Sequence, residues 1–233
     1  MSNSARSDIF ARLRDAGSGM SAGRIELERK SLGSAPAPAP PVAELCQAFL
    51  INVLKNQGSV DCAGNRAEAV KAVGNYLYAH FRNHRLVAGN DPRLAAMPWR
   101  DAGVLPRFGS LEAGEPVALS YAQLGVVETG AVVTRTGKAN PSTNNLLPEN
   151  HIVLVDVADL VPTLEHAWEK INQDMEEHGR PRGINFIAGP SSTADIEGQL
   201  VYGAHGPRHW HVILLGEVPA EARALVSDAA ASS

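Results

Sequence analysis

The sequence predicts a layered α/β fold built around a mostly parallel β-sheet. Segments with strand character alternate with segments of helical periodicity along most of the 233 residues, a pattern typical of parallel sheets covered by helices. Apolar residues make up 44% of the chain, enough to bury a sizeable core. Residues 117–155 break the alternation with several strand-like segments and no helix. We therefore expect an antiparallel or mixed portion in this region.

The chain is expected to have three parts. Residues 1–41 hold a short N-terminal helix and a linker, since the Pro-rich stretch Ala35–Pro41 suits an extended conformation. Residues 42–218 form the α/β domain, and residues 219–233 form a helical tail. Within the domain we expect helices at 43–57, 66–81 and 160–179, and strands at 59–63, 86–89, 104–108, 117–121, 126–127, 131–134, 151–155, 184–188 and 211–215.

Periodicity and end signals support these elements. Leu45 and Phe49 share one face of the first domain helix, and Gly58 supplies its end. The helix expected at 160–179 is amphipathic and ends at Gly179 in the same way. The expected strands are short apolar runs bounded by turn residues, as buried strands of a parallel sheet should be.

The closing segment, residues 184–215, is predicted to be a strand–helix–strand unit. Gly189-Pro190 ends the first strand. Ser192 and Asp195, which follow, have the spacing of a helix capping box. The helix is predicted from apolar residues four apart, which would form a buried stripe: Ile196, Leu200 and Ala204. Such a unit would place its first loop at the carboxyl end of the sheet, where α/β proteins bind ligands.

That first loop is a candidate substrate-binding site. Free backbone N–H groups at a helix start attract anions. We expect Gly189, Ser191 and Thr193 to face a small anionic metabolite, with Asp195 orienting them. In the alternative interpretation, Ser192 and Asp195 are a capping box and nothing more.

Glu128-Thr129-Gly130 is a second candidate site, located between two β segments. A carboxylate at a strand break suits a catalytic general base, and Thr129 and Gly130 would allow close approach of a substrate. In the alternative interpretation this tripeptide is a turn with Glu128 in solvent.

His205-Gly206 follows the predicted helix and gives the third candidate. His205 would act as a catalytic acid or base, or contact the anion, and Gly206 would line the same site. His205, His209 and His211 could bind a metal only if the two predicted elements folded together, so we assign no metal.

Bulk properties exclude several classes of partner. A net charge of −4, with no long basic run, argues against nucleic acid. No apolar stretch is long enough to cross a membrane, and the first residues lack a secretory signal, which predicts a cytoplasmic protein. Cys46 and Cys62 cannot supply the four thiolates of an iron–sulfur cluster, so we expect no cofactor on this chain.

Three sequence blocks resemble one known family. They are GVVETG with the Val-Val-Thr that follows, LLPENHIV, and GPSSTADIE followed by GAHGPRHWHVILL, at residues 125–134, 146–153 and 189–215. In this order and spacing they resemble the LUD-domain family of the lactate utilization protein C type, over roughly residues 120–215. The resemblance implies a NagB/RpiA/CoA-transferase-like fold. It also implies membership of a three-protein cytoplasmic assembly that converts L-lactate to pyruvate, whose iron–sulfur clusters are carried by the partner subunits.

Two other functions remain open at this point. The chain could be a stand-alone small-molecule enzyme with the layout of CoA transferases and sugar-phosphate isomerases, in which Glu128 is a nucleophile or base. It could also be a non-catalytic scaffold that recruits partners through residues 1–41.

Overall fold

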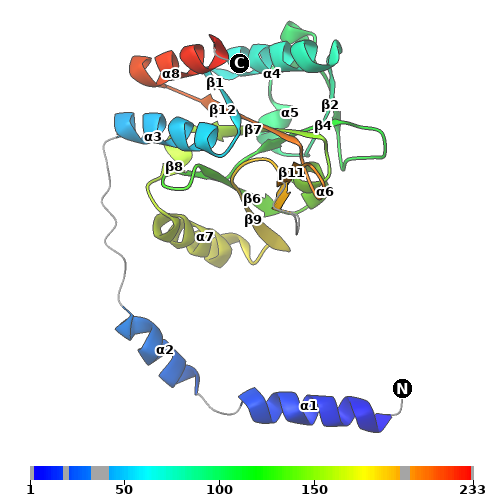
Figure 1. The fold of residues 1–233 in the computed structure, drawn as a ribbon, viewed down its shortest axis with the longest axis vertical. Coiled ribbons are helices and arrows are strands. Elements are labelled where there is room, and N and C mark those ends of the chain that lie inside the picture. The colour runs from blue at the N-terminus through cyan, green and yellow to red at the C-terminus, as the bar shows by residue number, and fades with distance from the viewer. Residues whose placement is uncertain (1–2, 18–20, 33–41, 195–199, 232–233) are drawn as a thin grey trace. The chain divides into compact units, whose positions relative to one another are not determined.

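The structure is a computed structural model that describes residues 3–17, 21–32, 42–194 and 200–231 (Figure 1). The chain divides into two compact units, Met1–Ala37 and Pro38–Ser233. The first unit contains the helices α1 (Asn3–Gly17) and α2 (Ala22–Ser31). Helix α1 covers the N-terminal helix expected from the sequence, and it exposes the apolar side chains of Ile9, Phe10 and Leu13.

A six-stranded parallel sheet forms the centre of the second unit. Every neighbouring pair in it is parallel, as the alternation of helices and strands predicts. From one edge to the other its strands are β1 (Ser59–Ala63), β12 (His209–Leu215), β7 (Asn150–Asp156), β4 (Val117–Tyr121), β2 (Arg85–Ala88) and β3 (Leu105–Phe108).

Apolar residues on both faces of this sheet are buried. Along β7, Ile152 and Leu154 join one core cluster and Val153 and Val155 the other, because successive side chains of a strand point to opposite faces. One face packs against α4 (Arg66–Phe81), α5 (Pro92–Ala95) and the 3₁₀ helix η1 (Trp99–Ala102). The other packs against α3 (Val42–Lys55) and α8 (Ala220–Ala231), which buries Ala222.

A second, four-stranded sheet contains the antiparallel pairing expected within residues 117–155. Its strands β5 and β6, and β6 and β9, are antiparallel, whereas β5 and β8 are parallel. In order they are β8 (Leu160–Val161), β5 (Leu124–Val126), β6 (Ala131–Thr136) and β9 (Gly183–Ile187). Helix α7 (Leu164–His178) packs Ala167 and Ile171 on this sheet, on the side of the unit away from α4 (Figure 1). Two short helices complete the fold, α6 (Ser142–Leu146) and η2 (Val157–Asp159). The expectation that residues 117–155 have no helix is wrong, because α6 lies among them, and β4 and β7 at the ends of this region belong to the parallel sheet.

The closing segment differs from its prediction. In place of a helix, β10 (Ser192–Ala194) and β11 (Leu200–Tyr202) form an antiparallel hairpin. Leu200 is 56% exposed and Ala204 is also exposed, so the predicted buried stripe is wrong at these two residues. Its third member, Ile196, lies outside the described residues. The strand–helix–strand unit is wrong as well, because β9 pairs with β6 in the small sheet while β12 lies in the large one.

In the described part of the chain, no helix combines the length and apolar character needed to cross a membrane.

Candidate functional site

The connections of the large sheet change direction between β2 and β4. From β2 the chain runs outward to β3 at the sheet edge, whereas from β4 it leads to β7 on the other side. Parallel sheets bind ligands at the carboxyl ends of their strands at such a switch point. A cavity of about 600 Å³ lies here and includes Tyr121, the last residue of β4. We call it the basic cavity; its charged lining residues are Asp91, Arg93, Arg135, Lys138, Asp174, Arg180 and Arg182.

Arg93 is held at the carboxyl ends of β2 and β4 by two neighbours. Its guanidinium donates to Asp91 through Nε at 3.1 Å and Nη2 at 2.8 Å, and it stacks 3.8 Å from the centre of the Tyr121 ring. Burial alone would lower the pKa of Arg93, but the hydrogen bond and charge of Asp91 raise it overall. Burial, followed by the hydrogen bond that Tyr121 donates to Asp156 at 2.7 Å, raises the pKa of the Tyr121 phenol. Arg93 is therefore a fixed cation with a neutral phenol beside it.

The opposite wall of the cavity comes from β6, α7 and the residues before β9. Arg135 donates to the Asp174 carboxylate at 2.8 Å and to the backbone oxygen of Gly179 at 2.6 Å. Both carboxylates of the cavity are thus in ion pairs with arginines that also line it. Within the described residues, Lys138, Arg180 and Arg182 have no carboxylate within 4.0 Å, so these three cations can bind an anion.

A buried chain of hydrogen bonds connects the large sheet to this wall. His151 on β7 contacts the Ser120 hydroxyl at 3.0 Å, and that hydroxyl donates to the Asn145 side chain. Asn145 in turn donates to Thr134 Oγ1 at 3.2 Å. Asn185 on β9 donates to Thr136, which lines the cavity, at 3.2 Å. Because the Asn145 amide bridges the two sheets, it fixes the position of β6 against the parallel sheet.

His151 is the titratable group of this chain of hydrogen bonds. It is fully buried, and burial lowers its pKa from 6.5 to about 3. The imidazole is therefore neutral around pH 7, as a hydrogen-bonded core histidine should be.

Glu128, predicted as a catalytic base, lies in the turn between β5 and β6 and its side chain is exposed. Its Oε1 accepts a hydrogen bond from the backbone N–H of Leu164 at 2.7 Å, at the start of α7. The N-cap residue Thr163 makes no side-chain capping bond, so Glu128 serves as the cap from another part of the chain. It is not among the residues that line the basic cavity.

Thr129 and Gly130 pack against helix α3. The Asn56 side chain donates to the Thr129 carbonyl at 2.7 Å, and Asn52 donates to the Val127 carbonyl at 2.8 Å. Gly130 has φ +66°, and a Cβ there would lie 2.6 Å from the Asn52 carbonyl carbon. The turn therefore needs glycine for its backbone conformation and for the close approach of α3.

Two of the predicted substrate-binding residues, Ser191 and Gly206, do come together. A Cβ at Gly206 would lie 3.0 Å from the Ser191 side chain, and the Ser191 N–H donates to the Pro207 carbonyl at 2.8 Å. Gly189 approaches the end of α3, where a Cβ would lie 2.4 Å from the Asn56 carbonyl oxygen. Since Pro207 comes just before β12, this loop lies at the amino edge of the large sheet. The expected position at the carboxyl edge is wrong, because β9 joins the antiparallel sheet.

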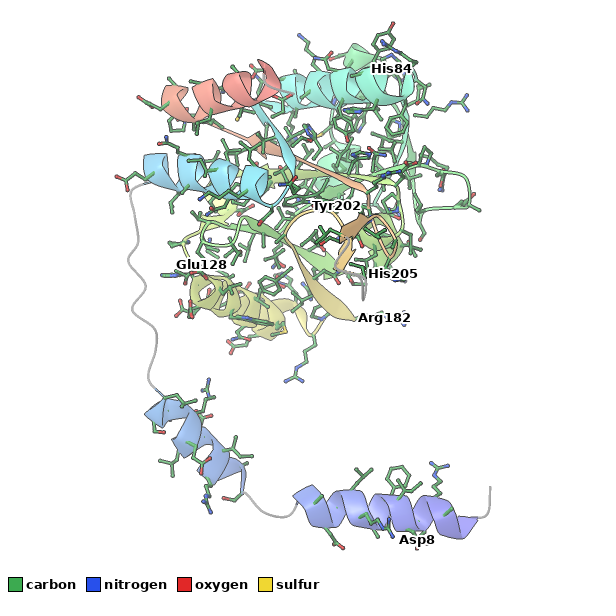
Figure 2. The ribbon with its side chains drawn as sticks, viewed as in Figure 1. Asp8, His84, Glu128, Arg182, Tyr202 and His205 are labelled. Atoms are coloured by element: carbon green, nitrogen blue, oxygen red, sulfur yellow. The ribbon has the colours of Figure 1, made fainter. Side chains whose placement is uncertain are left out.

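The other candidates are dispersed. Thr193 pairs with Val201 in the hairpin and is exposed, as is His205. Asp195 lies outside the described residues. Figure 2 shows Glu128 and His205 on opposite sides of the domain, so they do not form one site. The described residues contain no cluster of three metal-ligating side chains.

His211 has a packing role. Its Nδ1 lies 2.8 Å from the Ser59 hydroxyl, and its ring stacks on Tyr76 with 4.4 Å between the ring centres. Burial lowers its pKa to about 3. His211 is therefore a neutral core residue near the amino end of β12.

The residues of the basic cavity were not predicted from the sequence. Arg93, Arg135 and Arg180 come from segments about forty residues apart, and no spacing rule connects them. The available signal was the Asn90-Asp91-Pro92 turn directly after a predicted strand, which marks the carboxyl edge of a parallel sheet.

Comparison with known proteins connects this domain to one family. Residues 115–215 match the LUD domain model, which agrees with the resemblance seen in the sequence. The match contains the β6–β9 wall of the basic cavity, including Arg135 and Arg182, whereas Arg93 precedes it.

Two relatives share more of the chain, and a third matches a shorter part at higher identity. A protein of Macrococcus caseolyticus named lactate utilization protein C is 29% identical over 177 residues, covering 70% of this chain and 76% of that protein. A Bacillus subtilis protein of the same name is 28% identical over 193 residues, covering 72% and 79%. One from Geobacillus sp. is 37% identical over 92 residues, covering 39% and 38%.

A solved structure supports the fold. The crystal structure of a DUF162 family protein from Deinococcus radiodurans has a TM-score of 0.55 and 21% sequence identity, and the likeness covers 76% of this chain and all of that one. Residues 115–215 thus match the LUD domain model, and over about 70% of its length the chain is similar to proteins named lactate utilization protein C.

Proposed function

We propose that this protein acts in lactate utilization by binding a small 2-hydroxy or 2-oxo carboxylate, such as L-lactate or pyruvate, in the basic cavity. It would do so as a cluster-free component of a cytoplasmic system whose iron–sulfur centres lie on partner proteins. The names of its relatives support the lactate role. The observation that carries the ligand assignment is the cavity at the β2–β4 switch point, where Lys138, Arg180 and Arg182 have no acidic partner within the described residues.

The charged residues of the cavity suit binding better than proton abstraction. Arginine and lysine bind carboxylates through charge-assisted hydrogen bonds. Asp91 and Asp174 are held by Arg93 and Arg135 and are poor candidates for a base. Glu128 and His205, proposed from the sequence as acid–base residues, do not line this cavity. The role we assign to the chain is therefore to hold the carboxylate.

The cysteines of this chain do not suit an iron–sulfur cluster. An iron–sulfur cluster is usually held by four thiolates, and the sequence contains two cysteines. Cys46 is buried, and burial raises the pKa of the Cys62 thiol to about 12, which disfavours the thiolate that a metal needs. We therefore assign the acceptor of the lactate electrons to a partner protein.

A reconstitution experiment tests this proposal. L-Lactate-dependent dye reduction by the iron–sulfur partner proteins is measured with and without the full-length chain. We expect activity to require the chain and to fall with Arg180→Gln and Arg182→Gln, but not with Arg85→Gln, an exposed arginine outside the cavity. Equal rates with and without the chain would contradict a role in this system.

A further inference from the structure

A second cavity adjoins the basic cavity at the same edge of the parallel sheet. Its volume is about 890 Å³, and it shares Thr136, Gly137, Lys138 and Arg182 with the basic cavity. Asn90 and Ser110, which follow β2 and β3, bring it to the carboxyl ends of these strands. We call it the adjoining cavity.

The adjoining cavity has cations and no carboxylate in its lining. Lys138 and Arg182 are its charged residues, and in the described structure neither is in an ion pair. In the basic cavity, by contrast, Asp91 and Asp174 offset part of the positive charge. The adjoining cavity thus offers an anion two unpaired cations, Lys138 and Arg182, with no acidic group beside them.

Hydroxyl and amide side chains surround these cations. Ser142 and Thr143 come from α6, and Asn185 comes from β9. Asn185 also donates to Thr134 at 3.4 Å and Thr136 at 3.2 Å, which fixes it against the strand that carries the shared wall. The cavity therefore combines two cations with several neutral hydrogen-bonding groups on short side chains.

This combination matches a phosphoryl group better than a carboxylate. A phosphate monoester carries close to two negative charges and three terminal acceptor oxygens, whereas a carboxylate carries one charge and two oxygens. We propose that the adjoining cavity binds the phosphoryl group of a small phosphorylated molecule, next to the carboxylate bound in the basic cavity.

The proposal goes beyond the proposed function and does not depend on it, because the two cavities have separate diagnostic residues. Ser142 and Thr143 line the adjoining cavity alone, and Arg180 lines the basic cavity alone. Variants at these positions distinguish phosphate binding from lactate binding.

Isothermal titration of the full-length chain is the test. Inorganic phosphate, ribose 5-phosphate and AMP are titrated separately, so that a free phosphate, a sugar phosphate and a nucleotide can be told apart. We expect at least one of them to bind and Lys138→Gln to weaken it roughly tenfold, the usual loss for one charge-assisted hydrogen bond. Ser142→Ala and Thr143→Ala should weaken binding by a smaller factor.

Two control variants keep the result specific. Arg85→Gln removes an exposed charge that lines neither cavity, and Arg180→Gln removes one from the basic cavity alone. Both should leave phosphate affinity within twofold of the wild type. Absence of binding by all three probes would overturn the proposal. So would equal weakening by Arg85→Gln and Lys138→Gln, or strictly competitive displacement of phosphate by L-lactate.

Discussion

The Glu128 carboxylate accepts a hydrogen bond from the backbone N–H of Leu164 and thereby caps helix α7 across 36 residues of sequence. The helix has no side-chain cap of its own at Thr163. An acidic group at this end also interacts favourably with the helix dipole. Glu128 thus has a structural role, which the Glu128-Thr129-Gly130 sequence alone does not indicate.

Replacing Glu128 with alanine should lower the free energy of unfolding by about 1 kcal/mol, the usual cost of a lost cap. Glu128→Gln keeps an acceptor oxygen and should lose less. Urea denaturation measures both, with Glu169→Ala, an exposed acid in the same helix, as the control. Unchanged stability together with lost lactate turnover would contradict the cap and support the catalytic role that the sequence suggested.

Two glycines separate the effect of backbone conformation from that of close packing. Gly130 and Gly179 have similar φ values, +66° and +76°, but a Cβ would meet the α3 backbone at Gly130 and nothing within 4 Å at Gly179. Gly179, with φ +76° and ψ 169°, lies in a backbone region that is essentially restricted to glycine, so Gly179→Ala should cost roughly 1–3 kcal/mol of strain. Gly130→Ala should cost clearly more, because α3 must move. Equal losses in thermal or urea unfolding would show that the contact with α3 does not matter.

Asn145 should be essential for stability because its buried amide bonds to Ser120 and Thr134. Asn145→Ala leaves both hydroxyls short of a partner and opens a small cavity, which predicts a loss of roughly 2–4 kcal/mol in the free energy of unfolding. Asn185→Ala, at a half-buried position, should cost less. A loss below about 0.5 kcal/mol for Asn145→Ala, within the range of ordinary surface substitutions, would contradict its bridging role.

Acid should destabilise the fold through its buried histidines. Burial lowers the pKa of His151 and His211 from 6.5 to about 3, so between these values the unfolded chain binds more protons than the folded one. Stability is then fully present above pH 6.5 and falls as the pH drops toward 3. Each histidine should therefore lower the free energy of unfolding by about 2 kcal/mol at pH 5 compared with pH 7.

The pH dependence of urea unfolding checks this account. His151→Asn removes one titrating group, so its stability should change less between pH 7 and pH 5 than that of the wild type. The comparison uses the change with pH within each protein, and any uniform destabilisation by the substitution cancels. Identical pH dependence in the two proteins would contradict the assignment.

The sequence predicted the large sheet well and the closing segment poorly. Strands such as 59–63 and helices such as 66–81 have one dominant period and clear end signals, and they occur as expected. Between Ser192 and Tyr202, however, the four-residue spacing of apolar side chains favoured a helix although Leu200, Val201 and Tyr202 also suit a strand. The spacing of apolar residues could not decide between helix and strand here, because it predicts which side chains are buried and the hairpin leaves these side chains exposed.

The candidate site shows a different limit of sequence reasoning. Ser191 and Gly206 were assigned to one substrate site although they belong to two different predicted loops, and in the structure they do lie in contact, where the Ser191 N–H donates to the Pro207 carbonyl. The basic cavity depends on which strands become neighbours. Tyr121 meets Arg93 because β4 pairs with β2, and Arg135 reaches the cavity through the antiparallel sheet. Single-sequence periodicity does not contain this information.

The most direct test of the proposed function is equilibrium binding of L-lactate to the purified full-length chain, measured by isothermal titration. We predict saturable binding that Arg180→Gln weakens roughly tenfold, through loss of one charge-assisted hydrogen bond, while Arg85→Gln leaves it unchanged. Pyruvate should compete, because it presents the same carboxylate. Failure of both acids to bind, or lactate binding that is indifferent to Arg180, would contradict the assignment of the basic cavity as the carboxylate site.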